Sequence, residues 1–531
     1  MNSSLHRTAE SPRSAPGFSR ALLSLASASF LMLPWGAAGA GGPVQLVVQE
    51  APLTVLGREV AVVAIRQPDG TAGYFPERGG GFDVEVVNRL RVPTAIHWHG
   101  LILPNLMDGV PYVTQDPIAP GASMRYQFPL KQGGTYWMHS HFGLQEQFQA
   151  SAPLILWTTD EHAAATRQHV VSLTDFSFKK PGEILRGLKA GMKMPAMKTA
   201  DGKPAAMPKM GDGPPVELKA QIWNEATRSF SAGRVRRPMP DIDVRYDALL
   251  ANFRTLDDPQ VLPVSAGESV LLRFIAMSSS TGFLVDTSPL DAELVAVDGK
   301  PVAPLRGTVF QLATAQRMDL RVTIPPGGGA FPVLAQGEGT QQLCGVVLAT
   351  SGASVPRFTE AQRTAPLPAA ALDFTQERRL RARNPLPVRP ADRVLPAVLG
   401  GNMMRYVWTI NGKPYPHRDA LTVRSGERVH IAITNSTGMG HPMHLHGHDF
   451  QVVALDGQAV EGALRDTVLV PAGSGVRIAF DADNPGVWAF HCHLLYHLAT
   501  GMFTVVSYEG ADTRHWAPEK AASELLGLRA E

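Results

Sequence analysis

The stretch HCHLLYHLATGM, residues 491 to 502, places Cys492 between His491 and His493 and continues to His497 and Met502. Three of the chain's 17 histidines and one of its two cysteines lie in this short segment. Along an extended strand, successive side chains point to opposite faces, and residues two apart share a face. Cys492 then faces away from His491 and His493, so the segment predicts ligands for two different metal sites.

Histidines elsewhere in the chain repeat the His-x-His spacing. Ten of the 17 lie in four clusters, namely HWHG (His97, His99), HSH (His139, His141), HPMHLHG (His441, His444, His446) and HCHLLYH (His491, His493, His497). Four pairs at this spacing offer eight imidazoles, which is more than one metal ion takes. Imidazole suits copper, zinc, iron and nickel. The clusters therefore predict a centre of several metal ions.

A second ligand set contains the cysteine. Cys492 and His497, together with the distant His441, form a His₂Cys set in which Met502 offers a thioether as a weak axial ligand. This combination is typical of blue-copper electron-transfer sites. Because the residues on either side of Cys492 belong to the histidine cluster, a short covalent route for electrons would join the two sites.

The composition limits the class of protein. A chain of 531 residues has room for about three domains of roughly 150 residues each. Lys plus Arg (49) nearly balances Asp plus Glu (47), which argues against nucleic acid as a partner and favours small molecules. Abundant Gly and Pro, with Val-rich runs such as FDVEVVNRL and RVHIAITN between turn residues, predict an all-β protein.

The first 40 residues are typical of an export signal. Basic residues extend to Arg20, and an apolar run, ALLSLASASFLML, precedes the small residues Ala38 to Ala40. The run is shorter than the roughly 20 residues that a membrane-spanning helix requires. We therefore expect cleavage after Ala40 and an exported protein without a membrane span. Single arginines leave the export route open.

Turn-rich boundaries divide the remaining chain into three blocks. The expected divisions are 44–160, 165–355, a Pro- and Arg-rich linker at 356–400, 401–510, and a tail at 511–531 that includes a short surface helix. A Met-rich insertion at 192–210 lies in the second block, among Lys, Pro and Gly, and contains Met192, Met194, Met197, Met207 and Met210. The sulfur of methionine is a soft ligand that favours Cu(I). The insertion is thus a candidate Cu(I)-capture segment, or else a surface loop.

The four clusters resemble, in their order and spacing, those of multicopper oxidases, which are three-domain cupredoxin enzymes related to laccases. The resemblance covers about residues 45–510, and the segments HCHLLYH and RYVWTINGKPYP are most similar to bacterial exported oxidases of the copper-resistance type. It implies three cupredoxin-like Greek-key β-sandwich or barrel domains and a periplasmic location. It also implies four copper ions, one of type 1, one of type 2 and two of type 3, with dioxygen as electron acceptor.

The resemblance also assigns ligands residue by residue. The type 1 copper would be held by His441, Cys492, His497 and Met502, and the type 2 copper by His97 and His444. One type 3 copper would take His99, His139 and His493, and the other His141, His446 and His491. Clusters of the first and third blocks must then meet, and the three-copper site would lie between those blocks.

Four further positions bear on the reaction. Asp108, in NLMDGVP, is either the Asp of an Asp-Gly turn or the carboxylate that the family places at this spacing to deliver protons. Leu498 stands where some cuprous oxidases have a proton-delivering glutamate. Met439 resembles a methionine that contacts Cu(I) in those oxidases, although Thr437 replaces their aspartate.

Several functions remain open on the sequence alone. The leading prediction is an oxidase whose donor is Cu(I), with a role in copper tolerance, and the first alternative is a laccase-like oxidase of phenols or other small organic donors. A non-catalytic periplasmic copper buffer would use the same ligands. A structural cupredoxin protein with incidental copper or zinc is the third alternative.

Overall fold

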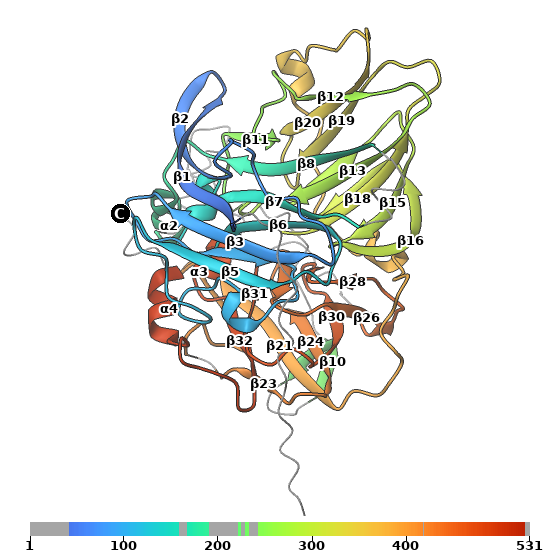
Figure 1. Cartoon of the computed structure of the whole chain (residues 1–531). Helices are drawn as coiled ribbons and strands as arrows, with labels where there is room; N and C mark the ends of the chain where they lie inside the picture. Colours follow the sequence, from blue (N-terminus) through green and yellow to red (C-terminus); the bar gives the residue numbers. More distant parts are fainter. Residues whose placement is uncertain are drawn as a thin grey trace, which may run out of the picture. The chain divides into compact units, whose positions relative to one another are not determined.

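Paired strands make up most of the structure, a computed structural model that describes residues 42–158, 167–190, 221–224, 229–232, 243–417 and 419–525 (Figure 1). From residue 43 onward these belong to one unit. The predicted export signal and the Met-rich segment 192–210 lie outside the described residues. The prediction of an all-β protein with three cupredoxin-like domains is confirmed, since each block contributes its own pair of sheets.

The first block contains a four-stranded and a three-stranded sheet. The orders are β2-β1-β3-β5 and β4-β6-β7, with bounds β1 (Val44–Val55), β2 (Arg58–Arg66), β3 (Gly81–Asn88), β4 (Ile96–His99), β5 (Ser123–Pro129), β6 (Gly134–Ser140) and β7 (Ser151–Leu156). Strand β3 shows why the chain is extended here, because Phe82, Val84 and Val86 are buried while the residues between them are not. Strands β4 and β6, in contrast, are buried almost throughout.

The second block contains a six-stranded and a five-stranded sheet. The six-stranded order is β11-β8-β13-β18-β15-β16, with β8 (Arg167–Phe176), β11 (Ala248–Ala251), β13 (Ser269–Ala276), β15 (Ala292–Val297), β16 (Lys300–Gly307) and β18 (Arg317–Thr323). The five-stranded order is β12-β20-β19-β14-β17, with β12 (Val261–Val264), β14 (Phe283–Asp286), β17 (Val309–Leu312), β19 (Ala330–Gly337) and β20 (Leu343–Thr350). Cys344 is buried in β20, as its apolar surroundings predict. A hairpin joins β9 (Gln221–Asn224) and β10 (Ser229–Ala232).

The third block again has two sheets. The larger contains β21 (Arg393–Asn402), β22 (Val407–Ile410), β24 (Arg428–Asn435), β26 (Phe450–Leu455), β27 (Gln458–Ala459), β28 (Leu464–Arg465) and β30 (Gly475–Asp481). The smaller has the order β23-β32-β31-β25-β29, with β23 (Leu421–Val423), β25 (His441–Leu445), β29 (Thr467–Val470), β31 (Val487–Cys492) and β32 (Phe503–Tyr508). Strand β21 begins inside the predicted linker and pairs with β24, because Ala397 and Leu399 alternate into the core.

Short helices complete the described structure. They are α2 (Pro181–Lys189), α3 (Leu495–Ala499) and α4 (Pro518–Leu525), with 3₁₀ turns η1 (Asn105–Met107), η2 (Gln145–Phe148), η3 (Glu360–Arg363) and η4 (Glu377–Arg379). Helix α4 lies in the predicted tail, where Ala521 packs against a small apolar cluster. Among the described residues, no helix has the length and apolar character needed to cross a membrane.

The main hydrophobic core explains how the first and third blocks come together. A single cluster of buried side chains contains Trp98 and Met138 of the first block together with Met443, Phe490 and Cys492 of the third. The second block has a separate core around β13, β18 and β20. Apolar packing between the first and third blocks therefore brings the strands that carry the histidine clusters together.

Candidate metal centre

Two pairs of neighbouring strands present the histidine clusters. Strands β4 and β6 are antiparallel with His97 opposite His139, and β25 and β31 are antiparallel with His444 opposite His491. All four of these side chains are buried. Cross-strand neighbours lie about 4.5–5.5 Å apart at Cβ, so each pairing places two imidazoles side by side.

The two strand pairs face each other across the boundary between the first and third blocks. The ring of His97 stacks on that of His446 with 3.8 Å between centroids, and the ring of His99 stacks on that of His444 at 3.7 Å. Residues more than 300 positions apart in the sequence therefore form one compact group of imidazoles.

Ligand atoms of the clustered histidines gather into sets of three. Atoms within 4.8 Å of one another come from the sets His97, His444 and His446; His97, His99 and His139; His141, His446 and His491; and His441, Cys492 and His497. The ring of His493 completes the group, with centroids 5.1 Å from His99 and 5.0 Å from His139. The structure thus brings together the ten histidines and Cys492 that the sequence predicted as ligands, in two separate groups.

One nitrogen of most of these rings has no protein partner. The buried atoms without one include Nε2 of His97, His139, His141, His444 and His493, and Nδ1 of His99. Nε2 of His446 and Nε2 of His491 face each other at 3.0 Å. A buried polar atom without a partner is costly, and a metal ion bound by these nitrogens would satisfy them. The residues present therefore fit a copper cluster.

Burial keeps the rings in the form that binds metals. Burial is the main cause that lowers the pKa of six of these imidazoles, and neighbouring histidines lower it further; the six are His99, His139, His141, His444, His446 and His493. Burial also lowers the pKa of His491 to about 4. A lowered pKa favours the neutral ring, whose free nitrogen carries the lone pair that a metal needs.

The second group surrounds Cys492. Its Sγ lies 3.6 Å from Nδ1 of His441 and 3.9 Å from Nδ1 of His497, and these two nitrogens are 3.2 Å apart. Met502 is fully buried and its carbonyl accepts the backbone N–H of Cys492 at 3.0 Å. The thiol and two imidazoles therefore converge on one point, on the opposite face of β31 from the large histidine group.

Polar residues hold the outer nitrogens of both imidazoles in this second group. Nε2 of His441 lies 2.7 Å from Oγ1 of Thr437, and Nε2 of His497 lies 2.9 Å from Oδ2 of Asp243. The hydroxyl of Tyr406 donates to the same carboxylate oxygen at 2.7 Å. Such contacts fix the orientation of a ligand ring. Asp243 belongs to the second block and carries no local sequence signal.

Asp108 contacts two histidines of the large group. Its Oδ2 accepts from Nδ1 of His446 at 2.9 Å, and its backbone carbonyl accepts from Nδ1 of His97 at 2.8 Å. Gly109, at φ +85°, lies so close to β4 that a Cβ would overlap the carbonyl of Ile96. The Asp-Gly turn is therefore real, and it positions a carboxylate beside the imidazoles.

Glu146 is a buried carboxylate that the sequence reading missed. Its Oε2 lies 3.0 Å from Nδ1 of His139, and its Oε1 lies 3.9 Å from Nδ1 of His493. Burial raises the pKa of this carboxyl well above its usual value. Glu146 and Leu498 line the same small cavity, so a carboxyl group is present although position 498 is apolar. Its spacing, five residues after His141, is the signal that could have revealed it.

Sequence comparison agrees with the geometry. Profiles of the multicopper oxidase family match residues 63–160, 222–355 and 387–512. The multicopper oxidase MmcO of Mycobacterium tuberculosis is 32% identical over 80% of this chain and 79% of its own length. The chain belongs to the multicopper oxidase family. It is therefore an enzyme that holds type 1 copper and a trinuclear copper centre and uses dioxygen as electron acceptor.

Other relatives cover most of the chain. A copper resistance protein A homolog of Pseudomonas syringae pv. tomato is 28% identical over 90% of this chain and 95% of its own length. The crystal structure of a multicopper oxidase from Pseudomonas thermotolerans has a TM-score of 0.59 at 24% identity and covers 87% of this chain and 98% of its own. The structural match supports the fold of this multicopper oxidase.

The remaining predicted positions lie in different settings. Met439 is buried, with 5% of its surface exposed, and its carbonyl accepts from the side chain of Asn435 at 2.7 Å. The five methionines of segment 192–210 lie outside the described residues. His448, which the sequence left unassigned, lies 2.6 Å from the hydroxyl of Tyr508, which is a structural contact.

We expect Asp108→Asn to slow dioxygen reduction roughly ten- to a hundredfold while copper content is unchanged, because an amide keeps the turn but cannot carry a proton as the carboxyl does. Copper per chain and oxygen uptake measure the two properties. A turn residue without a chemical role predicts equal turnover in the variant and the wild type across pH.

Proposed function

We propose that the residues of the two groups hold four copper ions in the partition that the family resemblance implies. His441, Cys492, His497 and Met502 would hold the type 1 copper. The type 2 copper takes His97 and His444, one type 3 copper takes His99, His139 and His493, and the other takes His141, His446 and His491. The unpartnered ring nitrogens support metal binding, and two of the three-atom sets coincide with this partition, namely His141 with His446 and His491, and His441 with Cys492 and His497.

The chain itself separates electron uptake from dioxygen reduction. Cys492 belongs to one group and its sequence neighbours His491 and His493 belong to the other, so the backbone links the two groups covalently. Copper bound by these residues would supply one-electron transfer from a donor to dioxygen, whose reduction to two waters takes four electrons and four protons. Asp108 and Glu146 are two of the buried carboxyl groups that contact the cluster ligands, and they lie where protons are needed.

We further propose that the electron donor is Cu(I) and that the enzyme serves copper tolerance. The observation that carries this proposal is the setting of Met404. Its side chain is 75% exposed on the turn between β21 and β22, two residues before Tyr406. Tyr406 donates to Asp243, which in turn contacts the type 1 ligand His497. The exposed thioether of Met404 is a soft ligand suited to Cu(I). It lies on the same turn as Tyr406, which is connected through Asp243 to His497 of the proposed type 1 site.

Other features support Cu(I) as donor. Met439 lies two residues from His441 in the same apolar cluster as Cys492 and Met502, although its burial makes Met404 the better first contact. The relatives include a copper resistance protein A homolog. Segment 192–210 would add five more thioethers for capture.

Two alternatives make different demands on the same residues. A laccase-like oxidase would use Asp243 as acceptor for the hydroxyl of a phenol, and it would not need exposed methionines. A non-catalytic copper buffer would bind copper in both groups without consuming oxygen. We also propose that the protein is exported to the periplasm, which rests on the signal-like residues 1–40.

We predict that Cys492→Ser abolishes the blue colour of the copper-loaded protein, because the colour arises from charge transfer between the thiolate and copper. Oxidation of any donor should fall to the detection limit. Visible absorption and oxygen uptake are the measurements. A variant that stays blue and active would contradict the type 1 assignment.

Replacing His493 with Ala should have the complementary effect. Oxygen uptake is lost, while the blue copper is still present and is bleached by a reducing donor under argon. The reason is that His493 belongs to the large histidine group and not to the Cys492 group. Unchanged oxygen uptake would contradict the proposed partition.

Deleting residues 192–210, or replacing Met404 with Leu, should lower kcat/KM for Cu(I) severalfold and leave kcat/KM for a small phenol unchanged. Leucine keeps the apolar volume and removes only the sulfur. Steady-state oxygen uptake with each donor at low concentration measures the ratio. If both donors are affected equally, or neither is, the laccase-like function becomes the better proposal.

A further inference from the structure

His99 is oriented differently from its neighbours in the cluster. Its Nε2 lies 3.1 Å from Oδ1 of Asp466 and 3.1 Å from Oγ1 of Thr467, while its Nδ1 has no protein partner. His97, His139 and His444 show the reverse, with Nδ1 bonded to the protein and Nε2 free. The acceptor at position 466 therefore determines which nitrogen of His99 points to the cluster.

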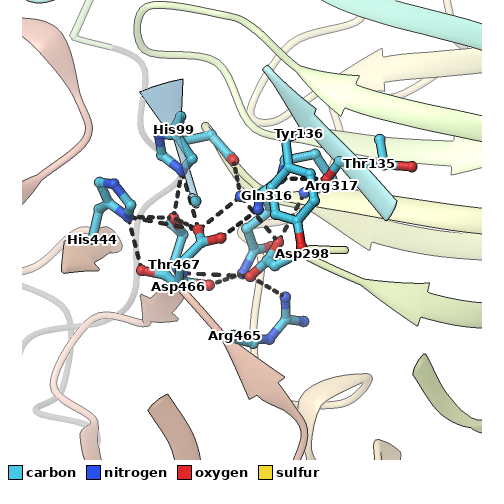
Figure 2. Close-up of polar contacts among 12 residues, drawn as sticks. His99, Thr135, Tyr136, Asp298, Gln316, Arg317, His444, Arg465, Asp466 and Thr467 are labelled. Atoms are coloured by element: carbon cyan, nitrogen blue, oxygen red, sulfur yellow. Dashed lines mark hydrogen bonds and ion pairs between the residues drawn. The ribbon is translucent and has the colours of Figure 1, made fainter. Parts of the chain in front are cut away.

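Asp466 and Thr467 also orient the ring that stacks on His99. The backbone carbonyl of Asp466 accepts from Nδ1 of His444 at 2.8 Å, and the Thr467 hydroxyl lies 3.1 Å from the same nitrogen. That hydroxyl also donates to Oδ1 of Asp466 at 2.8 Å. One dipeptide thus fixes two imidazoles that belong to different blocks of the chain (Figure 2).

A buried arginine of the second block holds the Asp466 carboxylate. Arg317 makes a bidentate ion pair with Asp466, in which Nη1 donates to Oδ1 at 2.7 Å and Nη2 donates to Oδ2. Both side chains are essentially inaccessible to solvent. Nε of Arg317 donates to the carbonyl of Thr135, on the same strand as His139. Arg317 therefore contacts all three blocks at once.

The ion pair is embedded in a larger charged network. Asp298 accepts from the backbone N–H of Arg317 at 2.9 Å and from the side chain of Arg465 at 3.0 Å. Arg465 also donates to Glu377 at 2.8 Å. Two arginines and three carboxylates alternate, so the guanidinium of Arg317 is held from several sides and has little freedom to move.

The chain leaves space for this ion pair next to His99. Gly100 has φ +87°, and a Cβ at this position would overlap both the Asp466 carboxylate and the Arg317 guanidinium. The glycine of the HWHG motif is therefore required by the ion pair as well as by its backbone conformation.

We propose that the Arg317–Asp466 ion pair is a positioning device that turns Nδ1 of His99, rather than Nε2, toward the copper cluster. The second block supplies none of the ten clustered histidines, yet through Arg317 it sets the geometry of one of them. This inference rests on the proposed ligand set, in which His99 binds copper. Arg317 and Asp466 are positioning residues, since they act on copper only through His99 and His444.

A matched control exists in the same block. Arg273 is also fully buried, donates to Asp319 at 3.0 Å and donates to the Thr135 hydroxyl at 2.8 Å. Arg273 also donates to Oε1 of Gln168 at 2.7 Å, and Asp319 accepts from the Thr135 hydroxyl at 2.6 Å. Arg273→Lys therefore reproduces the loss of a buried guanidinium between the first and second blocks, at a residue whose partners named here do not include the Asp466 carboxylate.

The test uses the full-length, copper-loaded protein. Arg317→Lys should lose copper from the cluster to a competing chelator at about ten- to a hundredfold lower chelator concentration than wild type, while blue absorption is retained. Arg273→Lys should hold cluster copper as wild type does, even if both variants unfold at a lower temperature. Equal copper retention in the two variants would overturn the proposal.

A crystal structure of the copper-loaded wild type tests the proposal without any variant. Copper on Nδ1 of His99, with Nε2 on Asp466, is the expected result, and copper on Nε2 would overturn the inference. A cluster that contains copper but leaves His99 unbound would instead contradict the proposed ligand set, so the two failures can be told apart.

Discussion

The imidazoles of the two histidine groups are buried away from water. Each ring has to be uncharged to offer a lone pair to a metal ion. Burial lowers the pKa of rings in both groups, such as His99 and His441, and most of the rings bond to the protein through one nitrogen and keep the other free. Carboxylates provide several of these contacts, from Asp108, Glu146, Asp243 and Asp466. Buried carboxylates carry their own desolvation cost, which Arg317 offsets for Asp466 and which raises the pKa of Glu146. The buried carboxylates orient the neutral rings by hydrogen bonds, and ion pairs such as Arg317–Asp466 stabilise a carboxylate in turn.

Much of the fold, and the grouping of the histidines with Cys492 that the structure shows, could be predicted because the signals are local. Alternation along a strand places Cys492 opposite its flanking histidines, and the same alternation gives the Val-rich runs their buried face. Histidines with structural roles are usually scattered along a sequence, whereas ten of the 17 histidines here lie in four short clusters. Family resemblance then supplied the domain type and the pairing between distant clusters, which spacing alone does not determine.

The residues that were missed act through contacts distant in sequence. Arg317 is one arginine on an ordinary strand, and its partner Asp466 is 149 positions away. Asp243 reaches His497 across 254 positions. No local pattern marks such pairs, since a single charged residue on a strand usually faces solvent. Glu146 differs, because it lies near the HSH cluster and its contact with His139 follows from a short turn.

Ligands drawn from both ends of the chain also constrain when the cluster can exist. Three hundred residues separate His141 from His441. Synthesis at about 5–20 residues per second takes roughly 15–60 s to cover that distance. During this interval the four histidines of the first block have no third-block partner. The large histidine group therefore cannot form. Assembly of the large histidine group is therefore a late event in the life of the chain, because it has to wait for the third block.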